Sequence, residues 1–316
     1  MKPKIMCIGM CGIDVLIKGA DLKTPFIKEG KPVESVDFSV GGDAANEAVT
    51  LSSLGSDTML VSGIGRDDTG KLIKTILESA NVRTNRLVYD EKNKSSINVV
   101  VIGEDGQRNF LSPPDTEAWK FEMPLEDLKD VSIISLGSLM IPPFDECENI
   151  CRIVKAAKNN GACVCADVIA GEHRKSLDEI KEALFYIDYF FPNDYEAELL
   201  TGKKDVEEMA DEFLKYGIKN VIIKIGKNGC FVKNKERAFR MSAYSVDAVD
   251  TTGAGDNFAA GFIHALSEGK SLEECCKFAA AVAAIAVQKV GANGAVKSKE
   301  QVLSFMESHK LRGECE

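Results

Sequence analysis

Hydrophobic and polar positions follow two kinds of pattern along this chain, one typical of strands and one typical of helices. Over most of the chain the two patterns alternate, with a strand followed by a helix. Short continuous apolar runs predict buried strands, whereas apolar positions three and four residues apart predict amphipathic helices. The predicted strands are 5–9, 58–63, 132–136, 162–167, 189–191 and 220–225. The predicted helices are 41–54, 69–80, 145–158, 206–216, 253–268, 272–290 and 299–309. Alternation of this kind predicts an α/β fold with a parallel sheet covered by helices on both faces.

Two early stretches do not follow this alternation. Residues 14–40 include a polar, turn-rich part from 20 to 37. In residues 95–111, apolar strands at 96–102 and 107–111 flank Gly103-Glu104-Asp105-Gly106, the pattern of a β-hairpin. We therefore expect a small β-sheet lid, formed by about 14–40 and 95–111, inserted into the core of one domain that spans residues 1–316.

Composition and charge exclude several classes of partner. The 316 residues are 45% hydrophobic and 28% charged, as in an ordinary globular protein. The net charge of −10, without a cluster of Lys and Arg, argues against nucleic-acid binding. There is no secretory signal pattern at the start and no apolar run of membrane-spanning length. We expect a cytoplasmic protein without a membrane partner, in which the ten cysteines are reduced.

The most informative segment is 250–258, which reads Asp-Thr-Thr-Gly-Ala-Gly-Asp-Asn-Phe at the start of a predicted helix. A helix N-terminus presents unpaired N–H groups and a positive dipole end, and small residues there leave room for an anion. Asp256 adds a carboxylate beside this anion site, which suits transfer of a phosphoryl group to a hydroxyl that must lose its proton. The alternative is an ordinary helix start capped by Asp250 or Asp256.

A second segment, 41–46, reads Gly-Gly-Asp-Ala-Ala-Asn and also opens a predicted helix. Gly41 and Gly42 would let a polyol approach the backbone, and Asn46 offers both a donor and an acceptor to hydroxyl groups. Asp43 suits neutral hydroxyls and disfavours a sugar that already carries phosphate. Taken on its own, the segment fits a plain helix N-terminus with glycine in the turn better than a sugar site.

Both segments resemble signatures of the ribokinase-like, or PfkB-type, carbohydrate kinases, usually written D-T-x-G-A-G-D-x-F and G-G-x-x-x-N. The resemblance covers nearly the whole chain. It implies a Rossmann-like core, a β-sheet lid that closes over the substrate and, in many members, a homodimer contact through that lid. It also implies ATP as donor, Asp256 as catalytic base, and phosphoryl oxygens received by the N–H groups of Gly253, Ala254 and Gly255. The aspartate at the position of Asp14 binds substrate hydroxyls in relatives.

The resemblance also implies the nucleotide and metal positions. Asn193 and Glu196 match the N-x-x-E element that organises Mg²⁺ and phosphate through water, although the same pair fits a capping box. Segment 224–229, Lys-Ile-Gly-Lys-Asn-Gly, corresponds to a nucleotide-contacting segment, which predicts that Lys224, Gly226 and Gly229 contact ATP; a solvated hairpin is the alternative. Asp250 and Thr252 flank the place where relatives bind K⁺, which leaves K⁺ open here.

The chain departs from family patterns at three places. Lys224 stands where Thr or Ser is frequent, and Ala280 stands where some relatives place Asn near adenine. Segment 167–171 reads Asp-Val-Ile-Ala-Gly, unlike the D-x-N-x-R of fructokinase-like relatives, which weakens a fructose assignment; His173 and Arg174 nearby are potential substitutes.

From this we predict ATP-dependent phosphorylation of a primary hydroxyl on a free sugar of ribose or ketohexose type. Three alternatives remain at this point. A nucleoside kinase would use the same atoms, with Phe26, Phe38 and Phe110 forming a slot above the ribose. The others are a non-catalytic module that senses sugar or nucleotide, and a kinase for phosphorylated sugars, which Asp43 disfavours.

Overall fold

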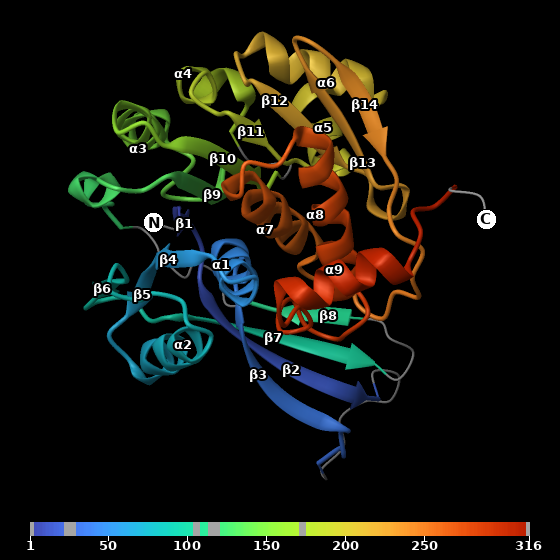
Figure 1. The fold of residues 1–316 in the computed structure, drawn as a ribbon. Helices are drawn as coiled ribbons and strands as arrows, with labels where there is room; N and C mark the ends of the chain where they lie inside the picture. The colour runs from blue at the N-terminus through green and yellow to red at the C-terminus, as the bar shows by residue number, and fades with distance from the viewer. Residues whose placement is uncertain (1–2, 22–29, 104–107, 113–120, 171–174, 314–316) are drawn as a thin grey trace.

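An eight-stranded sheet runs through the centre of the protein (Figure 1). The computed structural model describes residues 3–21, 30–103, 108–112, 121–170 and 175–313. The strand order is β14-β13-β12-β11-β10-β9-β1-β4, and the six strands from β12 to β4 are parallel. These six are β4 (Asp57–Val61), β1 (Lys4–Ile8), β9 (Ile133–Leu139), β10 (Cys163–Val168), β11 (Tyr189–Phe190) and β12 (Asn220–Lys224). The antiparallel strands β13 (Cys230–Asn234) and β14 (Ala238–Met241) complete it.

Helices cover this sheet on both faces, as the sequence predicts. One hydrophobic core includes buried side chains of α1 (Asp43–Ser53), α2 (Asp68–Ser79), α7 (Ala254–Ser267), α8 (Leu272–Ala286) and α9 (Lys299–Ser308). The other includes those of α3 (Cys147–Asn159), α4 (Lys181–Leu184), α5 (Asp194–Thr201) and α6 (Val206–Lys215). Within the described ranges, none of these helices combines the length and the apolar composition that a membrane span requires.

A smaller, four-stranded sheet lies apart from the main one (Figure 1). Its order is β3 (Ser35–Gly41), β2 (Gly12–Ala20), β7 (Ser96–Gly103) and β8 (Arg108–Leu111). Asp14 lies directly opposite Ser39 of β3 and Asn98 of β7, so these three polar side chains share one face. Phe38 lies opposite Val15 and therefore belongs to the other face. A short parallel pair, β5 (Gly63–Gly65) and β6 (Val88–Asp90), stands next to α2 (Figure 1).

Several predicted boundaries were wrong. The helix predicted for 272–290 ends at Ala286, where the Val287 carbonyl accepts the N–H groups of Val249 and Asp250. The strand predicted for 58–63 is two strands in two sheets, because β5 pairs with β6 rather than with β1. The hairpin β13–β14 was not predicted as strands, since its residues mix Lys, Asn and Arg with apolar ones and show no clear alternation.

Candidate active site

The N-terminus of α7 opens onto a cavity of about 490 Å³. Its N-cap is Gly253, which has a left-handed φ of 69° and no side chain to close the helix end. A Cβ atom there would lie 2.7 Å from the Ala292 side chain, so a larger residue would be both strained and crowded. Ala254 and Gly255, the next two residues, line the cavity. The predicted anion site is thus an open helix end with small residues around it.

Asp256 lies in the first turn of the same helix, next to the predicted acceptor residues. Its Oδ2 accepts a hydrogen bond of 2.7 Å from Nδ2 of Asn46, which joins the two sequence motifs across the fold. Burial raises the pKa of Asp256 to about 6; the Asn46 hydrogen bond and the charge of Lys224 oppose this, while Asp167 adds to it. A carboxylate with a pKa near 6 is ionised at neutral pH, yet more basic than an ordinary Asp.

Asp43 is the first residue of α1, and its two carboxylate oxygens differ in their hydrogen bonding. Its Oδ1 accepts hydrogen bonds from the Ala44 N–H, at 2.7 Å, and from the Ser138 hydroxyl. Its Oδ2 is buried and has no hydrogen-bond partner among the described residues. Burial and the nearby Asp256 charge raise the pKa of Asp43 to about 7. A buried acceptor without a partner is costly, and a substrate hydroxyl would satisfy it.

Gly41 and Gly42 are packed closely against the protein's own atoms. The place where a Cβ of Gly41 would stand is taken by the Asp14 carboxylate, and that of Gly42 by the Met10 carbonyl. The glycines therefore permit close packing within the protein, and the approach of a polyol to their backbone stays a prediction. Asp14 remains at the site; its Oδ1 accepts from Nδ2 of Asn98 at 3.1 Å, and burial raises its pKa.

The predicted nucleotide residues come together around the same cavity. Asn193, Lys224, Gly226 and Gly229 all line it. Asn193 and Glu196 form the capping box of α5: the Asn193 side chain accepts from Glu196 N, and Glu196 Oε2 accepts from Asn193 N, both at 2.8 Å. Burial, followed by the Asp167 charge, raises the pKa of Glu196 to about 7. A bound cation would stabilise the ionised form of this carboxylate.

Lys224 links the nucleotide side to the acceptor side. Its ammonium forms an ion pair with Asp167, and its side chain is only 12% exposed. The Nζ atom lies 3.0 Å from where a Cβ on Gly255 would stand, so the glycine leaves room for this charge at the helix end. Burial alone would lower the pKa of Lys224, but the charges of Asp167 and Glu196 outweigh it and raise the pKa. Lys224 is thus held in an ion pair, while residues 226–228 form the turn between β12 and β13, as the hairpin alternative expects.

Part of the cavity lining is apolar. It includes Val246, Phe258, Ala280, Ala284 and Val287. Ala280, which stands where some relatives place Asn near adenine, therefore lines the cavity. Apolar lining residues of this kind suit a flat aromatic group.

The donor groups around the cavity decide which metal ions fit. Among the residues that the structure describes, no three His, Cys, Asp or Glu side chains cluster so as to hold a metal ion. Magnesium keeps several waters and binds through few carboxylates plus substrate phosphates, so Glu196 beside the cavity fits it. Asp250 is 3% exposed and accepts 2.7 Å hydrogen bonds from the N–H groups of Thr252 and Gly291, which joins the segment predicted to flank K⁺ to the loop after α8.

Four residues at the site were not predicted as site residues: Asn98, Ser138, Asp167 and Asn293. Asp167 ends a predicted strand, and the carboxyl ends of parallel strands are where ligands bind, so this rule is the signal that could have found it. Asn293 lies in the loop after α8 and no pattern marks it. Phe26 and the side chain of Phe110 lie outside the described residues, as do His173 and Arg174.

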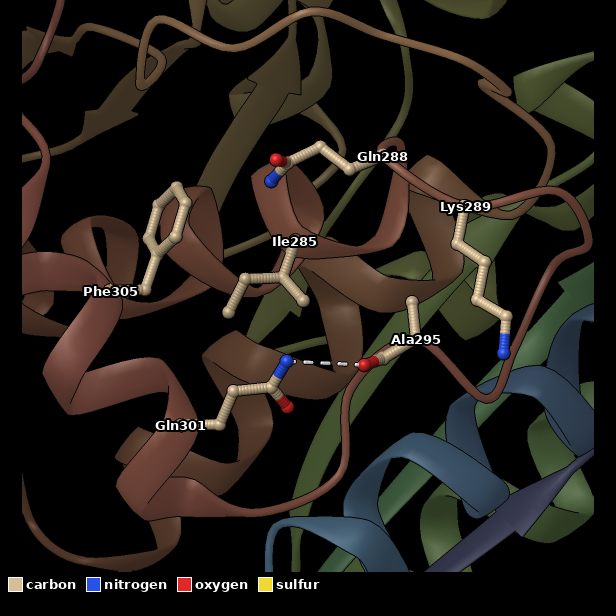
Figure 2. Close-up of a pocket in the computed structure, with 6 residues that line it drawn as sticks. All are labelled: Ile285, Gln288, Lys289, Ala295, Gln301 and Phe305. Atoms are coloured by element: carbon tan, nitrogen blue, oxygen red, sulfur yellow. Dashed lines mark hydrogen bonds between the residues drawn. The ribbon is translucent and has the colours of Figure 1, made fainter.

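A second cavity, of about 270 Å³, lies between α8 and α9 (Figure 2). Its lining is Ile285, Gln288, Lys289, Ala295, Gln301 and Phe305. The Gln301 amide donates to the Ala295 carbonyl at 3.3 Å, as the dashed line in Figure 2 shows. None of the predicted site residues lines this cavity.

Comparison with known proteins shows which families and structures this chain is similar to. Residues 2–299 match the pfkB family of carbohydrate kinases. The chain is 29% identical to a ribokinase of Haemophilus influenzae, covering 89% of this chain and 92% of that protein. It is 28% identical to a probable fructokinase of Arabidopsis thaliana, covering 84% and 86%. Among solved structures, Arabidopsis thaliana ribokinase complexed with ribose and ATP superposes with a TM-score of 0.82 at 29% identity, covering 97% and 99%.

Proposed function

The chain belongs to the pfkB family of carbohydrate kinases, which transfer phosphate to a hydroxyl, and from that membership we propose that it phosphorylates a primary hydroxyl of a free sugar with ATP. We propose a sugar of ribose or ketohexose type. The observation that carries the proposal is the hydrogen bond between Asn46 and Asp256. It holds the acceptor motif against the open helix end where a phosphoryl group would arrive.

On the acceptor side, Asp14, Asp43 and Asn46 would orient the sugar hydroxyls. The free Oδ2 of Asp43 supports a neutral hydroxyl as its partner and disfavours a phosphate group there. Asp256 would accept the proton of the attacking hydroxyl. A pKa near 6 is too low to form a free alkoxide, but phosphoryl transfer is loose and the proton can leave late.

On the donor side, the backbone N–H groups of Gly253, Ala254 and Gly255 would receive the transferring phosphoryl oxygens. The Lys224 ammonium, 3.0 Å from where a Cβ on Gly255 would stand, would add positive charge at the same place. A magnesium ion held by phosphates, water and Glu196 would neutralise further charge. We propose K⁺ near Asp250 and Thr252 as an additional requirement.

The nucleoside alternative gains no support from the aromatic residue that can be placed. Phe38 lies on the face of β3 opposite to that of Ser39, the residue across from Asp14, and is 60% exposed.

The face of the small sheet that carries Phe38 is apolar. Val36, Ile97 and Leu111 share this face by register and are 52%, 38% and 63% exposed. We propose that a second copy of the chain covers this apolar face. Replacing Phe38 with Asp should shift the molar mass from dimer to monomer in light scattering, whereas a monomeric wild type would contradict the proposal.

The test is coupled ATP turnover with Mg²⁺, with and without K⁺, across ribose, ketohexoses, sugar acids, phosphorylated sugars and ribonucleosides. We expect the highest kcat/KM with a free sugar. Turnover with ribonucleosides alone would replace the proposal by the nucleoside alternative. Nucleotide binding without turnover of any acceptor would favour a sensing module.

A further inference from the structure

The loop between α8 and α9 is anchored to the active site at consecutive residues. The Gly291 N–H donates to Asp250 Oδ2 at 2.7 Å, and the Ala292 carbonyl accepts from Nδ2 of Asn257 at 2.7 Å. Asn257 follows Asp256 on α7. These two hydrogen bonds therefore fix the loop relative to α7, the helix that carries the proposed base. They also fix the position of the next residue, Asn293.

The amide of Asn293 connects three segments of the chain. Its Nδ2 donates to the Val40 carbonyl at 2.7 Å and to Oδ1 of Asn46 at 3.0 Å. Its Oδ1 accepts from the Ser39 hydroxyl at 3.2 Å. Both hydrogens of the NH₂ group are thus used, one on strand β3 and one on the acceptor motif.

This arrangement determines which way the Asn46 amide points. An ionised Asp256 can only accept hydrogen bonds, so Asn46 must present its NH₂ group to it. Asn293 presents NH₂ to the opposite end of the same amide, which only the Asn46 oxygen can accept. If Asn46 turned over, two donors would face each other at Asn293 and two acceptors would face each other at Asp256. Asn46 is 5% exposed, so water has little access to relieve such a mismatch.

The same amide ties the base to the small sheet. Ser39 and Val40, both bonded to Asn293, lie on β3 opposite Asp14 and Ile13 of β2. Hydrogen bonds therefore run in one direction, from the Ser39 hydroxyl through Asn293 and Asn46 to Asp256. The strand that neighbours Asp14 is in this way connected to the proposed base by two side chains.

We propose that Asn293 is a positioning residue for phosphoryl transfer, which holds the Asn46 amide with its NH₂ toward Asp256 and couples that orientation to strand β3. This inference rests on the proposed function, in which Asp256 is the base. It assigns a role to a residue outside the two motifs.

The test uses Asn293→Asp, which keeps the size but removes the NH₂ group, and Asn293→Ala, which removes the whole amide. The assay uses ATP and the free sugar with the highest kcat/KM in the acceptor panel, starting with ribose. For Asn293→Asp we expect kcat to fall roughly ten- to hundredfold, the range for loss of a hydrogen bond to a charged group, here the bond from Asn46 to Asp256. The KM for ATP should stay within about twofold, since the loss is in orientation of the base rather than in nucleotide binding. Lys289→Ala, in the same loop and exposed, is the control and should retain the wild-type kcat.

A double-mutant cycle separates positioning from a merely structural role. In an Asn46→Ala background, replacing Asn293 should cause little further loss of kcat, because its effect acts through Asn46. Equal losses in both backgrounds, or a wild-type kcat in both Asn293 variants, would overturn the inference. Thermal melting identifies a variant that fails to fold, and the other substitution then supplies the comparison. If the wild type phosphorylates sugar and Asp256→Asn stays active, Asp256 is not the base. The proposed role of Asn293 is then rejected as well, whereas the sugar kinase activity is not.

Discussion

Two helix N-termini face the same cavity, and they are built in opposite ways. The start of α5 is closed by its own side chains, with Asn193 and Glu196 satisfying each other's backbone N–H groups. The start of α7 has Gly253 as N-cap, which supplies no side chain for this purpose. Both Asn193 and Gly255 line the cavity. The closed end supplies a fixed wall, whereas the open end supplies backbone donors for an anion.

The same contrast extends to other helices of the protein. Helix α1, which carries Asp43 and Asn46, also has a glycine N-cap, Gly42. Helices α2, α6, α8 and α9 begin with Asp67, Asp205, Ser271 and Ser298, and each of these side chains accepts a backbone N–H of its own first turn. Among the described α-helices, α1 and α7 are the two with a glycine N-cap, and both of these starts carry residues of the proposed chemistry.

The largest effect should come from removing the proposed base at the open helix end. Asp256→Asn keeps the size and the contact with Asn46 but cannot accept a proton, so we expect kcat to fall on the order of 10²- to 10⁴-fold. ATP binding should persist, because the N–H groups of α7 are unchanged. Steady-state kinetics and ATP titration measure the two quantities. Glu307→Gln, the same change of charge on the exposed part of α9, is the control, and near-wild-type turnover by Asp256→Asn would show the base assignment to be wrong.

Filling the open end should have the next largest effect. In Gly255→Ala, the added Cβ would lie 3.0 Å from the Lys224 ammonium, which must then shift slightly away from the helix end. We expect kcat/KM for ATP to fall roughly tenfold, less than the 10²-fold that a misplacement of about 1 Å can cost. Gly30→Ala is the control, because a Cβ there meets no atom of the described residues within 4 Å. Unchanged ATP kinetics in Gly255→Ala would mean that Lys224 does not act at this helix end.

The two helix ends also show how far sequence reasoning reaches. The motifs at Gly253–Asp256 and Gly41–Asn46 predicted both helices with a glycine N-cap. Glycine and other small residues leave a helix N-terminus open to a ligand, and a carboxylate next to them adds an acceptor, so these residue types can be interpreted without the structure. The α/β class followed from periodicity alone. Asn293 was not predicted, since its role depends on a loop that returns to α1 across the fold. Strand β13 was missed because its pattern is not periodic, and the packing of Asp14 beside Gly41 could not be predicted because it depends on the pairing of β2 with β3.

The pH dependence of kcat should report the proposed base. Its pKa is raised to about 6 and its active form is ionised, so protonation of Asp256 lowers activity about tenfold per pH unit below this pH. Asp43 and Glu196, whose pKa values are raised to about 7, add their own dependence above it. Because the Asn46 hydrogen bond lowers the pKa of Asp256, Asn46→Ala should move this acid limb to higher pH. A pH–rate profile with saturating substrates measures both. An acid limb near pH 4, or one that does not move in Asn46→Ala, would contradict this assignment.

The smallest effect should come from the closed helix end, and it tests whether its capping residue has a second role. Asn193→Ala removes the cap of α5, and Ser271→Ala removes the equivalent cap of α8; Ser271 is not among the residues that line the cavity. Each should lower the free energy of unfolding by about 1 kcal/mol, measurable by denaturant titration. Because Asn193 also lines the cavity, only Asn193→Ala should raise the KM for ATP, by roughly fivefold, the equivalent of one net hydrogen bond. If both variants lose stability and neither changes the KM, Asn193 is only a cap, and the nucleotide is bound by the open end and by Lys224 without it.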